Sequence, residues 1–307
     1  MKYNVEKSIF IDKNISEVVS FVTDFTNWIK WSPWNVLEPK CKMVYSGNAG
    51  QVGHTMEWQG EYIGSGRQTL TKIENGHYDY DVEFLKPFKS KSKAGMVLES
   101  FEGGTKVTWT LDGSLPFFLF FMVNTMKNWI GMDYERGLRM LKSVAENGIV
   151  PAVTTNNGVV DREGFGYIGI QRTVLLSELA PVMNKDFETL VGEIAKHNVS
   201  AKHWVCLYTK MDMKKMQMTY IAAISDENLS GVQLGDGFVR GQVKAGKGLE
   251  IKHKGSYEFL GNAWSMGMMY AKAKKLKGSD IPYEYYWNDP RQTGTADLET
   301  SIFFPVK

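Results

Sequence analysis

The sequence predicts an α+β protein made of two domains. Its 307 residues exceed the usual size of one hydrophobic core, and 43% of them are apolar, which is enough to fill two. Short alternating segments fill most of the first half, which ends in one long stretch with helical spacing. The second half repeats one run of elements at a constant spacing. We therefore expect an antiparallel sheet with a closing helix, followed by a duplicated unit.

The first domain begins with a strand and a short helix. Val5–Ile11 alternates apolar and polar residues as a strand does, and Val18–Phe25 carries apolar residues at helical spacing behind the capping candidates Asp12 and Asn14. Strand-like segments follow over the next hundred residues and predict an antiparallel meander. Three turn signals separate them: Ser46-Gly47-Asn48, Glu74-Asn75-Gly76 and Glu102-Gly103-Gly104.

A long helix over residues 120–146 is expected to close this domain. Its apolar stripe runs along one face, and Glu135 with Arg139 forms an expected i,i+4 ion pair. The stripe comprises Ile130, Tyr134, Leu138, Leu141 and Ala145. We place the first domain at residues 1–147 and the second domain at 164–307. Residues 148–163 are expected to be a linker, because that segment shows neither helical nor strand periodicity.

The second half contains two runs of strand, helix, strand, strand. Segments 167–174, 180–197, 204–209 and 218–224 return as 249–254, 261–277, 283–287 and 300–306. Three pairs of positions differ by 80, namely Arg172 and Lys252, Trp204 and Glu284, and Thr219 and Glu299. Two βαββ units about a pseudo-twofold axis would form one sheet with both helices on one face. A ligand groove is expected across the other face.

Four motifs in the first half resemble the START-like (SRPBCC) superfamily, in its polyketide cyclase/dehydrase branch. They are Asn27-Trp28-Ile29-Lys30-Trp31-Ser32-Pro33-Trp34, Gly53 through Trp58-Gln59-Gly60, Gly104-Thr105-Lys106-Val107-Thr108-Trp109, and Gly131-Met132-Asp133-Tyr134-Glu135-Arg136-Gly137-Leu138 with Leu141-Lys142. The resemblance implies a helix-grip fold whose cavity holds lipids, hormones or polyketides. Positions on the central strands and closing helix would line that cavity: Trp58, Phe84, Trp109 and Met126.

Three motifs in the second half resemble the gyrase-inhibitor-like (GyrI-like) effector-binding domain, which also ends transcription activators of the AraC and MerR types. They are His253-Lys254-Gly255-Ser256-Tyr257, Pro282-Tyr283-Glu284-Tyr285-Tyr286-Trp287-Asn288-Asp289-Pro290, and Leu298-Glu299-Thr300-Ser301-Ile302-Phe303-Phe304-Pro305-Val306. The resemblance implies a glutamate in an aromatic pocket that receives cationic, drug-like ligands. Glu284 matches that glutamate, and Glu299 matches a second acidic position of the family.

Side-chain chemistry supports a cation site at Glu284. A carboxylate among aromatic rings loses hydration, so it takes up a proton or attracts a cation, and each ring face adds about 0.5–2 kcal/mol. Tyr286 shares the strand face of Glu284, whereas Tyr257 and Trp204 are the expected walls. His253 is interpreted as a structural residue that fixes the turn at Gly255.

Composition argues against several classes of function. Lys plus Arg total 36 against 34 acidic residues, and no basic recognition helix precedes the second domain, so direct nucleic-acid binding is disfavoured. Cys41 and Cys206 form neither a disulfide framework nor a zinc site, which favours a reducing cytoplasm. The sequence contains no metal motif and no phosphate loop, so no metal or other cofactor is expected. The longest apolar run, Leu115–Val123, is nine residues, whereas a membrane span needs about 20.

The leading hypothesis is a small-molecule binding protein that senses, buffers or sequesters apolar or cationic ligands, with a pocket in each domain. The alternative is a hydrolase of reactive electrophiles, as relatives of the second domain imply, with Glu284 as general base and Tyr257 as proton donor. A third hypothesis is an adaptor that binds a partner through Phe117–Phe121.

Overall fold

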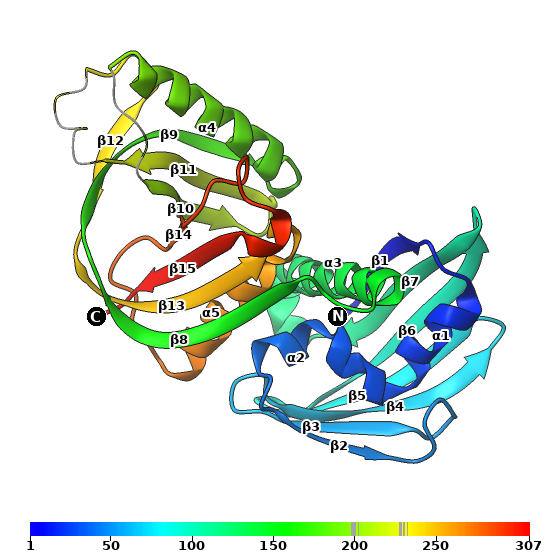
Figure 1. Ribbon diagram of the computed structural model, residues 1–307. Coiled ribbons are helices and arrows are strands. Elements are labelled where there is room, and N and C mark those ends of the chain that lie inside the picture. Colours follow the sequence, from blue (N-terminus) through cyan, green and yellow to red (C-terminus); the bar gives the residue numbers. More distant parts are fainter. Residues whose placement is uncertain (198–200, 202, 227–228, 230, 232) are drawn as a thin grey trace. The chain divides into compact units, whose positions relative to one another are not determined.

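The computed structural model describes residues 1–197, 201, 203–226, 229, 231 and 233–307. They form two compact units, Met1–Pro151 and Ala152–Lys307 (Figure 1). One antiparallel sheet organises each unit, with seven strands in the first and eight in the second over the described part of the chain. The prediction of a two-domain α+β protein is confirmed. Over these residues no helix is both long and apolar enough to cross a membrane.

The first unit is a seven-stranded meander with helices between its first two strands and after its last. The strand order is β1-β7-β6-β5-β4-β3-β2. The strands are β1 (Lys2–Ile11), β2 (Lys42–Ser46), β3 (Thr55–Gln59), β4 (Ser65–Glu74), β5 (His77–Lys86), β6 (Ser90–Phe101) and β7 (Gly104–Ser114). The helices are α1 (Ile15–Thr23), η1 (Phe25–Lys30), α2 (Pro33–Leu37), η2 (Phe117–Met122) and α3 (Val123–Asn147).

Aromatic packing holds α3 on this sheet. Trp109 of β7 stacks on Tyr134 of α3 with ring centroids 3.9 Å apart. Gly137 permits the approach, because a Cβ at that position would lie 2.8 Å from the Trp109 ring. The expected ion pair between Glu135 and Arg139 is wrong. Glu135 bonds instead to Lys7 of β1, so the helix is tied to the sheet.

The second unit carries two helices on an eight-stranded sheet of order β12-β9-β11-β10-β14-β15-β13-β8. The strands are β8 (Ala152–Arg162), β9 (Phe165–Leu175), β10 (His203–Asp212), β11 (Gln217–Ser225), β12 (Val239–Val243), β13 (Gly246–Gly255), β14 (Tyr283–Tyr286) and β15 (Glu299–Pro305). The helices are η3 (Leu176–Glu178), α4 (Leu179–Ala195), η5 (Tyr257–Phe259), α5 (Gly261–Ala273) and η6 (Thr295–Asp297).

A pseudo-twofold axis passes between β10 and β14. Val205 pairs with Tyr285, and Trp204 and Glu284 take equivalent places on either side of that pair, which is the expected spacing of 80. The spacing is not constant in the other strands. Ile224 opposite Trp204 corresponds to Ile302 opposite Glu284, a spacing of 78. The loops between the strands differ in length, so the register rather than the sequence number defines the repeat.

The expectation of an unstructured linker at 148–163 is wrong for most of its length, because residues 152–162 form strand β8. Strands β8 and β9 are one long strand broken only at residues 163–164, and β12 and β13 are a second broken at 244–245. Arg162 pairs with Gly246 before the break and Phe165 with Val243 after it, so the register continues without interruption. The two form a bent ribbon that joins the two edges of the sheet (Figure 1).

This ribbon covers the sheet face that carries no helices. Val243 and Val160 of the ribbon pack with Val205 and Tyr283 from the central strands in one buried cluster. The helices cover the opposite face, where Leu190 of α4 packs on Cys206. A groove on the face without helices is therefore not present at this place, and the expectation is wrong because strands β8 and β12 fill it.

Candidate functional site

Glu284 lies at the centre of the helix-covered face of the second sheet. It pairs with Cys206 of the neighbouring strand β10, and only 3% of Glu284 is exposed to solvent. Three side chains donate hydrogen bonds to its carboxylate. Tyr208 Oη lies 2.8 Å from Oε2, Trp264 Nε1 lies 2.6 Å from Oε1, and Tyr286 Oη also donates to Oε2. The acid is held by donors from β10, β14 and α5.

Burial and hydrogen bonding act in opposite directions on this acid. Desolvation raises the pKa of Glu284, whereas the hydrogen bonds from Trp264, Tyr286 and Tyr208 lower it, and the net shift is upward. Desolvation first, and then the nearby carboxylate, raise the pKa of Tyr257 to about 12. Both groups therefore favour their neutral forms more than they would in water.

The expected aromatic surroundings of Glu284 are present. Tyr257 packs edge to face on Tyr286 with ring centroids 5.8 Å apart, and Phe187 of α4 packs on Tyr286 and Trp204 at 6.0 and 5.5 Å. The expected open recess is not. Trp264 and Tyr286 occupy the space in front of the carboxylate, because each points a donor at it. A cation cannot contact Glu284 while both rings stay in place.

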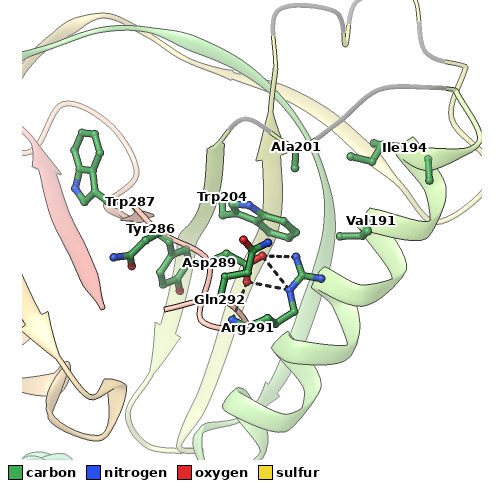
Figure 2. A pocket seen from close by; sticks show the side chains of 11 residues that line it. Val191, Ile194, Ala201, Trp204, Tyr286, Trp287, Asp289, Arg291 and Gln292 are labelled. Carbon is green, nitrogen blue, oxygen red and sulfur yellow. Dashed lines mark hydrogen bonds and ion pairs between the residues drawn. The ribbon is translucent and has the colours of Figure 1, made fainter. Parts of the chain in front are cut away.

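An open pocket of about 440 Å³ lies beside this cluster, between α4 and the segment after β14 (Figure 2). Tyr286 forms part of its wall, so the pocket and the buried acid share one ring. Three apolar residues of α4, Ala201, three aromatic residues, two amides and one ion pair line it. They are Val191, Ile194, Ala195, Ala201, Trp204, Tyr286, Trp287, Asn288, Asp289, Arg291 and Gln292.

A planar cation of the protein itself already lies against the pocket's tryptophan. The guanidinium carbon of Arg291 lies 5.5 Å from the ring centroid of Trp204. Arg291 Nη2 is 2.6 Å from Asp289 Oδ2, and its Nε is 2.9 and 3.1 Å from the two carboxylate oxygens (Figure 2). These hydrogen bonds lower the pKa of Asp289, so the carboxylate is ionised near neutral pH. Sequence reasoning missed this pair.

Two other predicted positions lie apart from the site. Glu299 of β15 is an ion-pair partner of Lys252, at 2.7 Å, and alternation turns it to the sheet face opposite Glu284. His253 is fully buried, its Nε2 lies 3.0 Å from the carbonyl oxygen of Ser256, and desolvation lowers its pKa. Glu299 is a half-buried strand residue in an ion pair, and His253 fixes the turn at Gly255.

In the first unit the structure brings two of the four predicted cavity residues into contact and places the other two elsewhere. Trp58 and Phe84 meet edge to face at 5.9 Å, because Gly66 between them leaves no Cβ in the way. Trp109 is 1% exposed and packs among Trp28, Trp31, Trp34 and Tyr134, so it belongs to the core. Met126 lies half-buried on α3. A cavity around these residues stays a prediction.

The hydrolase alternative needs a base beside water. Both oxygens of Glu284 already accept hydrogen bonds from side chains, so a water molecule would have to replace one of these donors. Tyr257 contacts the ring of Tyr286 and no hydrogen bond from it to Glu284 is formed in the described structure. Among the residues that the structure places, no group of three His, Cys, Asp or Glu side chains has the arrangement of a metal site.

Comparisons with known proteins assign a family model to each unit. Residues 2–146 match the model described as polyketide cyclase / dehydrase and lipid transport. Residues 159–307 match the model described as GyrI-like small molecule binding domain. No curated protein matches the chain.

Several solved structures resemble part of the chain. The Aha1 dimer of Colwellia psychrerythraea shares 20% identity over 48% of this chain and 98% of its own, with a TM-score of 0.36. An integron cassette protein of Vibrio cholerae shares 20% identity over 50% of this chain and 99% of its own, with a TM-score of 0.37. The C-terminal domain of EcmrR shares 16% identity over 51% of this chain and 98% of its own, with a TM-score of 0.38. Likenesses at this level leave function open.

Proposed function

The chain joins a domain of the polyketide cyclase/dehydrase and lipid-transport family to a GyrI-like small-molecule binding domain, and we propose that the second domain binds a planar organic cation in the pocket beside Trp204. Both families are small-molecule binding families. One observation carries the choice of ligand: the pocket already accommodates a guanidinium against an indole face and a carboxylate.

Arg291 marks the place that a ligand cation would take. A cation over an indole ring is worth about 0.5–1 kcal/mol at an exposed site and about 2 when desolvated. The Arg291 side chain is 61% exposed, so it can leave for water at little cost. An amidinium or guanidinium ligand would then stack on Trp204 and pair with Asp289 in its stead.

The remaining walls suit the apolar body of such a ligand. Val191 and Ile194 of α4 line the pocket together with the rings of Trp204 and Tyr286. The volume of about 440 Å³ falls in the range of sites for small organic molecules. In this proposal Glu284 does not touch the ligand. It accepts a hydrogen bond from the hydroxyl of Tyr286 and so fixes the ring that forms the inner wall.

Titration calorimetry with a planar aryl amidine and its neutral amide of the same shape tests the proposal. We expect the amidine to bind more tightly than the amide. Asp289→Asn should weaken amidine binding about tenfold, since a charge-assisted hydrogen bond is worth roughly 1.5–3 kcal/mol. Arg291→Ala should strengthen it, because the internal competitor is gone. Neither substitution should change binding of the amide.

The control is Asp161→Asn, which removes an exposed, ion-paired carboxylate of the same domain far from the pocket in the sheet order. It should leave amidine binding unchanged. Equal affinity for amidine and amide in the wild-type protein would contradict the proposal. So would weaker amidine binding after Arg291→Ala, because Arg291 would then support the ligand and not compete with it.

A further inference from the structure

Two neighbouring segments of the first domain expose aromatic side chains that nothing in the described structure covers. We call residues 84–89 and 117–122 together the phenylalanine rim. Phe88 is 81% exposed, Phe117 is 79% exposed and Phe118 is 71% exposed. Soluble monomers rarely leave so many large apolar side chains together in water, and such surfaces mark binding sites.

The sheet register brings both segments to the same end of the sheet. Strands β5 and β6 pair up to the turn that joins them: Glu83 pairs with Lys91, and the last pair is Phe84 with Ser90. Strand β7 lies on the other side of β6, pairs its Asp112 with Lys93 of β6, and continues to Ser114 before the second segment begins. The 84–89 turn and the 117–122 segment therefore lie at the same end of the sheet, and they follow strands β5 and β7, which are two positions apart in the strand order.

The rim segments themselves carry lysines and no acidic residue. Residues 84–98 and 113–132 contain five lysines and no Asp or Glu. Lys91 and Lys93 pair with Glu83 and Asp81 on β5. The three others, Lys86, Lys89 and Lys127, are exposed and have no acidic partner within the described ranges. Aromatic rings beside unpaired lysines are the composition of protein surfaces that lie on lipid headgroups.

We propose that the phenylalanine rim docks on the surface of an anionic phospholipid bilayer. The phenylalanine rings would enter the boundary between headgroups and acyl chains, and the unpaired lysines would contact lipid phosphates. A second copy of the chain fits less well. A symmetric interface would bring the same lysines of two copies together, and like charges oppose such contact. This inference is independent of the pocket in the second domain.

Co-sedimentation with phospholipid vesicles tests the proposal. We expect the full chain to bind vesicles that contain phosphatidylglycerol, to bind pure phosphatidylcholine vesicles much less, and to lose binding as salt is added. Phe118→Ser with Phe121→Ser should lower the partition coefficient by about tenfold or more, and so should Lys86→Glu with Lys89→Glu. All four side chains are exposed, so circular dichroism of the variants should match the wild type.

Two controls match these variants in chemistry. Phe101→Ser removes an exposed ring from the turn between β6 and β7 at the other end of the sheet. Lys214→Glu with Lys215→Glu reverses two lysines in the second domain. Both should bind vesicles as the wild type does. The proposal is overturned if the anionic vesicles do not bind, if the rim variants bind equally well, or if they only convert a dimer to a monomer in light scattering.

Discussion

The buried carboxylate of Glu284 shows how little a strand position says about its surroundings until the fold is known. Three donors surround it, from strands β10 and β14 and from helix α5. Alternation along 204–208 and 284–286 places Tyr208 and Tyr286 on its face. The sequence pattern does not say which residue of α5 reaches the acid, because that depends on how the helix packs on the sheet. Trp264 was therefore missed.

Glu284→Gln should change the pH dependence of stability. Desolvation holds the folded-state pKa of Glu284 above 4.5 despite its hydrogen bonds, so the folded protein binds this proton more tightly than the unfolded chain. That contribution is present below pH 4.5 and is lost as pH rises through the raised pKa. The amide resembles the protonated acid and does not titrate.

We therefore expect the free energy of unfolding of Glu284→Gln to increase relative to the wild type as pH rises from 4.5 toward neutrality. Urea unfolding at a series of pH values measures the difference. Glu299→Gln is a suitable control, since that acid lies on the other face of the sheet in a partly exposed ion pair with Lys252. A difference that stays constant with pH would show that the carboxyl group titrates alike in both states.

At the scale of elements, periodicity predicted the helices α1, α3, α4 and α5 and the central strands, and it failed at two edge strands. Strand β8 contains Thr154–Gly158, a composition typical of loops, and its side chains alternate between half-buried and exposed. It is a strand because β13 supplies its hydrogen bonds over ten residue pairs. Strand β12, only five residues long, similarly depends on β9. Tertiary pairing decides such segments, and local pattern does not.

Two glycines inside helices should respond oppositely to alanine. At Gly137 of α3 a Cβ would lie 2.8 Å from the Trp109 ring and 3.0 Å from Pro33, so Gly137→Ala must push the helix from the sheet at a cost of about 1–3 kcal/mol. At Gly192 of α4 an added Cβ would meet no atom within 4 Å beyond the helix's own backbone, so Gly192→Ala should stabilise by about 0.5–1 kcal/mol. Urea unfolding of both variants checks the signs. Two losses of similar size would show that the packing at Gly137 is not the cause.

For the whole molecule, the boundary between the units determines which fragments fold. Residues 152–307 retain β8, whereas residues 164–307 lack it and expose the edge of β13 and the cluster that Val160 covers. We expect the shorter fragment to melt about 10 °C or more below the longer one, or to remain unfolded. Thermal unfolding followed by circular dichroism compares them. Equal melting temperatures would mean that β8 adds no stability.

The bent ribbon also binds the two repeats of the second unit to each other. The strand before the first repeat, β8, pairs with the second repeat, and the strand before the second repeat, β12, pairs with the first. Each repeat thus completes its sheet with a strand borrowed from across the dyad, as in an intramolecular domain swap. Neither repeat is a separable folding unit, so hydrogen exchange of both should be governed by a single cooperative opening.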